Sequence, residues 1–452
     1  MKKNLNFMAL VFLFFGWGFI TVLNDLLTPI LKSAFMLSYF EANFVSFAFF
    51  IAYFIGGLLY FISNIIGIKF FTNLGYRGLI LLGLKLSGFG CLVFVGATIF
   101  KSYLIFLLGL FSIGFGFMFI QIAANPLVLI SGDANTGAAR LNIAQGFNSL
   151  ATTLAPIIGA IVFYNMLHVE SNYSALKYPY FIFSICFFAL AYFVVKFLTT
   201  DQTSITISAT NKPYALNHLN LLFGAIAIFF YVGSEVGIGA NFIALVKSGK
   251  IIQASGNVAS ELLAFYWGGA MIGRFLGGIA LNNKYKTSTK LIYMILTAVA
   301  LTILILQISQ SNVNLKYYIL HEILAIVILL FAKNSRRTLL LFAFVNIINL
   351  IIGIHLGNHL FAIWSIISIG IFNSIMWPNI FDLAIDGLGE YKEQGSSLLI
   401  MMILGGAIMP ILQGHIADKF DILTSYYVPI IGYVYILLYS IFYSKKTIKL
   451  IN

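Results

Sequence analysis

The chain consists mainly of long apolar stretches separated by short polar segments. Of its 452 residues, 61% are hydrophobic and only 9% are charged, which is too little polar surface to cover a water-soluble globule. Each stretch is about 20 residues long, the length that an α-helix needs to cross the hydrocarbon core of a bilayer. A membrane β-barrel would show short alternating strands instead. The sequence therefore predicts an all-α protein that crosses a membrane many times.

Hydropathy predicts about fourteen spans, six in the first half of the chain and eight in the second. A polar segment rich in Thr and Ser, 200–217, is expected to link an N-terminal bundle, 1–199, to a C-terminal bundle, 218–452. The expected spans are 7–31, 43–67, 78–98, 103–128, 142–166, 178–199, 218–246, 258–281, 289–308, 315–333, 338–356, 359–385, 395–417 and 426–444.

Short strings recur in the same order in the two halves. IGG at 55–57 matches IGR at 272–274, an offset of 272 − 55 = 217, whereas Pro156 and Pro410 in later matching strings differ by 410 − 156 = 254. The second half has therefore gained about 35 residues, enough for two short spans and a tight turn. We expect two six-helix bundles with pseudo-two-fold symmetry, plus an inserted helix pair at about 309–337 or 289–333.

The net charge of +12 comes from Lys and Arg residues dispersed between the apolar stretches. This dispersion argues against a nucleic-acid-binding face. The basic residues are more frequent in the segments on the side that holds the N-terminus. By the positive-inside rule, both termini are expected to be cytoplasmic. The first apolar stretch continues past any small-residue cleavage site, so we expect it to be retained as a span.

Sequence motifs of the common enzyme classes are absent. The chain has no P-loop, GxSxG or HExxH motif, and its six His residues are scattered. Cys91 and Cys186 lie in apolar segments without metal-ligand spacing. We therefore expect neither enzymatic activity nor a cofactor or metal, and we look for function among polar residues at membrane depth.

Asp25 lies inside the first apolar stretch, in WGFITVLNDLLTPIL. A carboxylate at membrane depth is costly, so such a residue is a functional candidate by default. We predict that Asp25 gains and loses a proton during a transport cycle, and that the preceding Asn24 contacts the substrate. The alternative is a structural acid that caps a helix or pairs within the bundle.

Amide side chains recur at helical spacing in the fourth and fifth spans. Gln121 and Asn125 are four residues apart, and Asn142, Gln145 and Asn148 follow one another at intervals of three. Amides both donate and accept hydrogen bonds, which suits sugar hydroxyls. We predict that Gln121, Asn125, Gln145 and Asn148 line a wet cavity that binds substrate. Hydrogen bonds between helices are the alternative.

The second half contains four further candidate substrate contacts. Glu235 and Asn241 lie in a Gly-rich apolar stretch, where a repeat offset near 210 puts Glu235 opposite Asp25; a structural role is equally open. Asn373 and Trp377 lie in NSIMWPNIF. Trp377 could stack on the apolar face of a sugar or anchor the helix at the membrane interface.

Gating or structural roles are expected for Arg274, Pro126 and Pro378. Arg274 lies close enough to the membrane interface to snorkel, so an ion pair is favoured over substrate contact. The two prolines interrupt helical hydrogen bonding in polar surroundings. No role is assigned to Lys85, and Glu322, which falls in the region of the inserted pair, is expected to have none in transport.

Five segments in combination resemble the fucose–galactose–glucose:proton symporter family of the major facilitator superfamily, and within it the bacterial glucose/galactose transporters. They are WGFITVLNDLLTPIL, QIAANPLVLI, ARLNIAQGFNSLATTLAPIIGA, YVGSEVGIG and IGIFNSIMWPNIFDLAIDGLGEYKEQGSSLLIMMILGGAIMPILQG. The likeness covers nearly the whole chain except about 309–337. It implies an inner-membrane sugar symporter with a central cavity between two six-helix bundles.

The resemblance also implies roles for individual residues. The coupling acid of the family falls on Asp25, and its polar cavity residues fall on Gln121, Gln145 and Asn148. Fucose-type members have a glutamate where this chain has Gln121, which implies glucose or galactose as the substrate.

We predict a secondary transporter that imports glucose or galactose with protons by alternating access. The alternatives are a fucose or other monosaccharide symporter, a sodium-coupled or exporting relative, and a non-transporting sugar sensor. The expected partners are a monosaccharide, a proton and the lipid bilayer, without nucleic acid. A monomer is expected.

Overall fold

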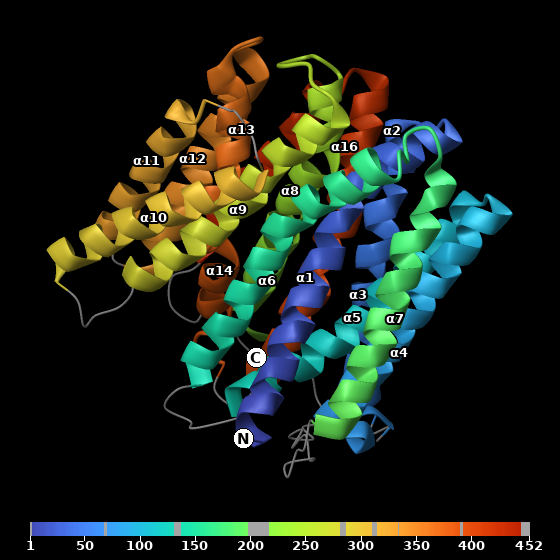
Figure 1. Cartoon of the computed structure of the whole chain (residues 1–452). Coiled ribbons are helices and arrows are strands. Elements are labelled where there is room, and N and C mark those ends of the chain that lie inside the picture. Colours follow the sequence, from blue (N-terminus) through green and yellow to red (C-terminus); the bar gives the residue numbers. More distant parts are fainter. Residues whose placement is uncertain are drawn as a thin grey trace.

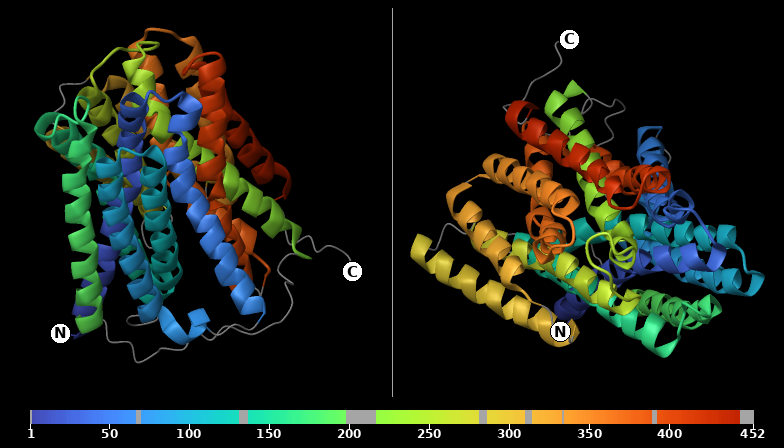
Figure 2. Two further views of the ribbon diagram at one scale, coloured as in Figure 1. Left: turned by 90° about the vertical axis from the view of Figure 1, so that its right-hand side faces the viewer. Right: turned by 90° about the horizontal axis from the view of Figure 1, so that it is seen from above.

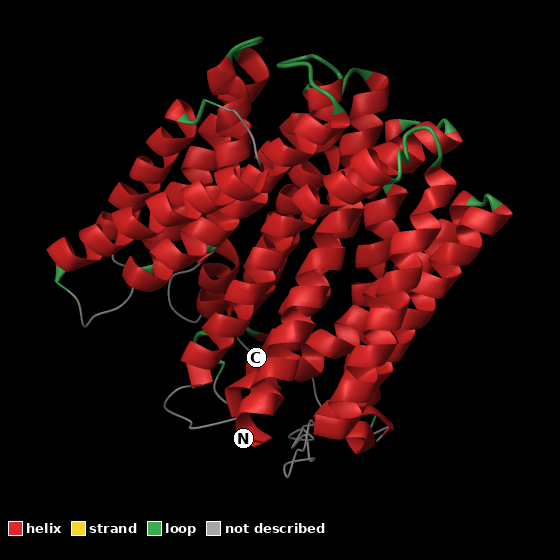
Figure 3. Cartoon of the chain, viewed as in Figure 1, coloured by secondary structure: helices red, strands yellow, loops and turns green. Residues whose placement is uncertain are grey.

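The computed structural model describes residues 2–66, 70–130, 137–197, 217–280, 286–309, 314–332, 334–388 and 392–443. Within these ranges the regular elements are helices, without a β-strand (Figure 3), which confirms the predicted all-α class. Among the described residues, thirteen helices are long and apolar enough to cross a membrane. The fourteenth expected span corresponds to α11, which has 17 residues. A helix of this length is about 26 Å long, slightly shorter than the hydrocarbon core of about 30 Å.

In the described part of the first half there are seven α-helices, of which α2 is a single turn before α3. Their bounds are α1 (Lys2–Phe35), α2 (Tyr39–Ala42), α3 (Phe44–Ile65), α4 (Phe70–Phe100), α5 (Tyr103–Ile130), α6 (Gly137–Ala160) and α7 (Lys177–Phe197). Helix α1 begins and α7 ends at the same end of the bundle, the lower one in Figure 1. We call this the terminal end and the opposite one the far end.

In the second half, two of the predicted spans are interrupted. The prediction 359–385 is split at Ser374 and Ile375, and the prediction 395–417 contains a 3₁₀ turn, Met402–Leu404. Pro378 lies in the first turn of α14, where a missing backbone N–H breaks no helical hydrogen bond. The helices are α8 (Leu219–Lys247), α9 (Gly256–Ala280), α10 (Thr287–Ser309), α11 (Lys316–Ala332), α12 (Ser335–His355), α13 (Leu360–Asn373), α14 (Met376–Ile385), α15 (Lys392–Met401), α16 (Gly405–Lys419) and α17 (Tyr427–Leu438).

The helices of the two halves pack in matching pairs. Helix α1 packs on α6 as α8 packs on α16, and α3 packs on α5 as α9 packs on α13. Helix α4 contacts α5 and α7, and the corresponding contacts with α13 and α17 are made by α12. This leaves α10 and α11 without a counterpart among the described helices of the first half. We propose that they are the inserted pair, which favours the placement at 289–333 over 309–337.

Helix α10 lies at the edge of the bundle (gold in Figure 2). Its outward side chains, such as Leu296 and Val299, are apolar and more than half exposed, as expected for a surface that faces lipid. The two halves meet elsewhere, along α6 and α9, along α3 and α16, and along α1 and α8. These six helices form most of the contact between the two halves and carry most of the predicted site residues.

Close helix packing depends on glycine at the contact of α9 with α13. A Cβ on Gly370 would lie 1.8 Å from the backbone carbonyl oxygen of Tyr266. We predict that Gly370→Ala forces the two helices apart and destabilises the protein by roughly 1–3 kcal/mol. The measurement is the unfolding temperature of the purified protein in detergent, followed by fluorescence. The matched control is Gly96→Ala in α4, because a Cβ there meets nothing within 4 Å. Equal unfolding temperatures for the two variants would contradict the prediction.

Candidate functional site

Asp25 lies where helices from both halves meet. The side chain is 4% exposed, and its Oδ2 accepts a hydrogen bond from Nε1 of Trp267 at 2.9 Å. Asp25 belongs to α1 and Trp267 to α9, so this bond joins the two halves. Gly239 of α8 faces the same carboxyl, since a Cβ there would lie 2.9 Å from Oδ2. The absence of a side chain at Gly239 thus allows α8 to approach both partners.

Trp267 was not among the predicted site residues. A buried indole usually has a partner for its N–H, so a Trp inside an apolar, Gly-rich span does indicate that an acceptor is nearby. The sequence does not identify that acceptor, because Asp25 is 242 residues away along the chain.

Glu235, the predicted counterpart of Asp25, lies on α8 among second-half partners. Its Oε1 accepts a hydrogen bond from Tyr231 Oη at 2.9 Å, and Tyr266 Oη donates to its backbone carbonyl at 2.9 Å. Arg274 of α9 lies within electrostatic range of the Glu235 carboxylate. Arg274 also donates to Ser149 Oγ on α6. Arg274 therefore brings a positive charge near Glu235 and also contacts the first half.

Asn373 belongs to a hydrogen-bonded network within the second half. Its Oδ1 accepts from Asn346 Nδ2 at 3.0 Å and from Tyr433 Oη at 2.8 Å, and its Nδ2 donates to Tyr266 Oη at 3.2 Å. The amide of Asn373 thus holds the end of α13 against its neighbours. Trp377 is half-buried, and its ring centroid lies 6.5 Å from that of Tyr231.

Two amides predicted to line a cavity make bonds between helices of the first half. Gln121 is 7% exposed, and its Nε2 donates to Tyr53 Oη at 2.9 Å, joining α5 to α3. Asn148 is 8% exposed, and its Nδ2 donates to the Phe14 carbonyl at 2.8 Å, joining α6 to α1. In both residues the amide N–H group therefore bonds to a neighbouring helix, as the alternative interpretation expected.

The neighbouring polar residues on α5 and α6 differ in their contacts. Asn125 Nδ2 donates to the Gln121 carbonyl at 3.1 Å, and its buried Oδ1 has no partner in the described part of the chain. Gln145 is half-buried, and its backbone carbonyl accepts from Ser149 Oγ. The side chains of Asn142 and Pro126 lie outside the described ones.

Asn24 and Gln413 are buried amides whose polar atoms have no partner among the described residues. They are 2% and 1% exposed, and both the oxygen and the nitrogen of each amide lack a hydrogen bond. An unpaired buried polar group costs about 1–3 kcal/mol, so such groups are candidates for contact with a polar ligand. Asn24 was among the predicted substrate contacts. Gln413, on α16, was not, although a polar side chain inside an apolar span could have marked it as a candidate in the same way.

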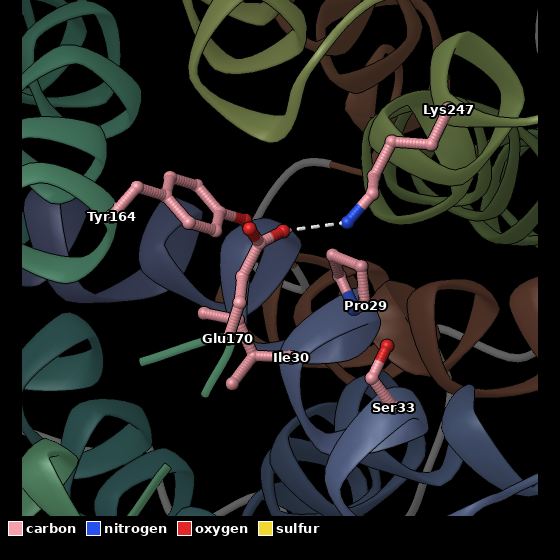
Figure 4. Close-up of a pocket in the computed structure, with 6 residues that line it drawn as sticks. All are labelled: Pro29, Ile30, Ser33, Tyr164, Glu170 and Lys247. Atoms are coloured by element: carbon pink, nitrogen blue, oxygen red, sulfur yellow. Dashed lines mark hydrogen bonds and ion pairs between the residues drawn. The ribbon is translucent and has the colours of Figure 1, made fainter. Parts of the chain in front are cut away.

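At the far end of the bundle, polar contacts hold the halves together. Asn241, predicted as a substrate contact, exchanges hydrogen bonds with Asn43 at 3.1 and 3.3 Å. The carboxylate of Asp418 at the end of α16 accepts from the backbone N–H groups of residues 39 and 40, at 2.6 and 2.7 Å. Glu170 and Lys247 form an ion pair at 2.7 Å beside a pocket of about 210 Å³ (Figure 4). The far end is therefore closed.

The remaining predicted residues lie away from this interior. Lys85 is exposed on α4, and Pro378 is exposed on α14. Glu322 is buried on α11, where it accepts a hydrogen bond from Thr302 Oγ1 of α10. Among the described residues, no three His, Cys, Asp or Glu side chains gather closely enough to hold a metal ion.

Comparison with known proteins gives full-length relatives. A glucose/galactose transporter of Brucella abortus biovar 1 (strain 9-941) is 35% identical over 452 aligned residues, which cover 98% of this chain and 96% of that protein. The L-fucose-proton symporter of Escherichia coli (strain K12) is 27% identical, with 97% of this chain and 93% of that protein covered. No protein-family model matches the chain.

Solved structures with the same fold include major facilitator superfamily transporters. The crystal structure of FucP in the outward conformation has a TM-score of 0.64 and 24% identity, with 99% of this chain and 100% of that chain covered. A bacterial homologue of the lysosomal transporter Spinster, inward-facing and occupied, has a TM-score of 0.61 and 12% identity, with 97% and 95% covered. At these identities the likeness shows the fold alone. On its sequence relatives and its fold together, the chain belongs to the fucose–galactose–glucose:proton symporter family of the major facilitator superfamily, a family of membrane transporters.

Proposed function

We propose that the protein imports a hexose together with protons by alternating access, and that Asp25 binds the transported proton. The observation that carries this proposal is the hydrogen bond from Trp267 to the buried Asp25 carboxyl. This bond places a group that can gain and lose a proton directly at the contact between the two halves.

The distribution of charge in the interior supports Asp25 over Glu235 as the proton carrier. Glu235 has Arg274 within electrostatic range, so a cation offsets part of its charge. The ion pairs among the described residues are Lys247–Glu170 and Lys250–Asp421, and they involve neither Asp25 nor Glu235. A carboxylate buried without a cation nearby is costly. Protonation removes that cost at Asp25, whereas at Glu235 it would give up the attraction to Arg274.

The Trp267 contact provides a physical link between protonation and movement of the halves. A hydrogen bond to a charged carboxylate is roughly twice as strong as one to a neutral acceptor. A proton arriving on Asp25 therefore weakens the contact between α1 and α9. A ligand that interacts differently with two conformations shifts the balance between them, so proton binding can bias the exchange between closed and open states of the far end.

For the substrate, we infer glucose or galactose, with fucose as the alternative. The relative with the higher identity, 35%, is named a glucose/galactose transporter, whereas the L-fucose-proton symporter is 27% identical. The unpaired amides of Asn24 and Gln413 and the free acceptor of Asn125 can bind sugar hydroxyls. The neutral amide of Gln121 supports the same inference.

We further propose that the protein is a monomer in the bacterial inner membrane with both termini in the cytoplasm. The N-terminal bundle is then 1–199, the cytoplasmic linker 200–217 and the C-terminal bundle 218–452. The excess of basic residues on the side that holds the N-terminus supports this orientation. The closed far end would then face the outside of the cell.

Asp25→Asn should abolish sugar accumulation driven by a proton gradient, because an amide cannot take up the coupling proton. Counterflow of labelled sugar at equal pH on both sides should persist, since exchange needs no net proton movement. Both are measured in proteoliposomes, with Asp382→Asn, an exposed carboxylate on α14, as the matched control. Undiminished proton-driven accumulation in Asp25→Asn would remove Asp25 from this role.

Loss of wild-type uptake when choline replaces sodium would indicate sodium coupling instead.

Substrate competition tests the identity of the sugar. Uptake of radiolabelled glucose by the wild-type protein should be reduced strongly by excess unlabelled galactose and only weakly by fucose, because the site presents neutral amides. The measurement is initial uptake in proteoliposomes at a fixed proton gradient, with mannose as a further competitor. Stronger competition by fucose than by galactose would contradict the inferred specificity.

A further inference from the structure

Both helices of the inserted pair contact α9 within residues 265–269. Tyr318 of α11 is fully buried, and its Oη donates to the backbone carbonyl oxygen of Phe265 at 3.0 Å. The rings of Tyr318 and Phe265 also meet edge to face, with their centroids 5.6 Å apart. A Cβ on Gly269 would lie 3.1 Å from the Tyr318 hydroxyl. Helix α11 therefore packs directly against both ends of this segment.

Helix α10 contacts the same segment at its centre. Ile305 is fully buried, and a Cβ on Gly268 would lie 2.4 Å from its Cδ1. The side chain of Ile305 thus fills the space that Gly268 leaves open. Both inserted helices therefore pack against α9 at residues next to Trp267, the partner of Asp25.

Tyr266 and Trp267 of the same segment make hydrogen bonds to Glu235 and to Asp25, the proposed proton site. Tyr266 Oη donates to the Glu235 carbonyl at 2.9 Å, and Trp267 Nε1 donates to Asp25 Oδ2 at 2.9 Å. A displacement of the α9 backbone at 265–269 would change both contacts, since a hydrogen bond weakens when its distance or angle departs from the optimum.

The inserted pair is itself held firmly by buried polar bonds. Glu322 on α11 accepts from Thr302 Oγ1 on α10. His321 Nε2 lies 3.0 Å from Asn349 Oδ1 on α12. Together with Tyr318, these residues tie α11 to three different helices. A helix anchored in this way can act as a fixed support for its neighbour.

We propose that the inserted pair positions α9 for proton coupling, and that Tyr318 is a positioning residue for the contact between Trp267 and Asp25. This inference rests on the proposed function, because it assigns the pair a role in the protonation of Asp25. It also gives a part in transport to a region that the sequence left without one.

Tyr318→Phe tests the proposal, since it removes the bond to Phe265 and keeps the ring. Loosening of α9 weakens the Trp267 bond that favours the charged carboxylate, so Asp25 takes up its proton more easily. We expect the pH of half-maximal uptake to move upward, by an amount equivalent to about a fivefold change in proton concentration. Counterflow at a fixed, equal pH should match the wild type. The measurement is the pH profile of sugar uptake in proteoliposomes.

Tyr317→Phe is the matched control, because this neighbouring hydroxyl makes no hydrogen bond in the described part of the chain, and its profile should match the wild type. A Tyr318→Phe profile that superimposes on the wild-type profile would overturn the proposal. If Tyr318→Phe does not yield folded protein, the pH profile of Ile305→Val tests the proposal instead, because this change removes one methyl group that packs against Gly268. The same upward movement supports the proposal, and an unchanged profile refutes it.

Failure of this inference differs from failure of the proposed function. If uptake by the wild-type protein does not depend on the proton gradient, the proposed function itself is wrong. If wild-type uptake is proton-driven and depends on Asp25, while the Tyr318 and Ile305 variants keep its pH profile, only the role of the inserted pair is rejected.

Discussion

The hydrogen bond between Trp267 and Asp25 is the interaction on which the proposed mechanism depends. It connects α1 to α9 at 2.9 Å across the two halves, in an interior where an uncompensated charge is expensive. Gly239 allows α8 to pack against the same two residues. The pseudo-symmetric bundle thus brings one acid and one neutral donor from opposite halves into contact. Glu235 differs from Asp25 in having a cation, Arg274, within electrostatic range.

Much of the fold could be predicted from the sequence, because bilayer thickness fixes the length of a span and water-free surroundings enforce helices. Asp25 was selected as a candidate in the same way, from the cost of a charge at membrane depth. The sequence left two possible ranges for the inserted pair, 309–337 and 289–333. A change in repeat offset gives the length of an insertion but does not show where in the chain it begins. The packing of α12 against α13 and α17 supports the range 289–333, because it leaves α10 and α11 without a counterpart among the described helices of the first half.

Side-chain partners were harder to predict, because they depend on contacts between distant segments. An amide in an apolar span can face a cavity or a neighbouring helix, and the spacing alone does not distinguish the two. Asn148 donates to Phe14 and Asn373 has three partners, whereas Asn24 keeps both polar atoms unpaired in the described part of the chain. Trp267 was missed because its acceptor is 242 residues away.

Infrared difference spectroscopy of the purified protein tests the central claim, that Asp25 binds and releases a proton, most directly. Spectra recorded at low and high pH, with and without glucose, report the C=O stretch of protonated carboxyl groups. The mechanism predicts a protonated-carboxyl band in the wild-type protein that titrates with pH, responds to sugar and is missing from Asp25→Asn. An identical, sugar-sensitive band in Asp25→Asn would assign the proton to another acid and contradict the mechanism.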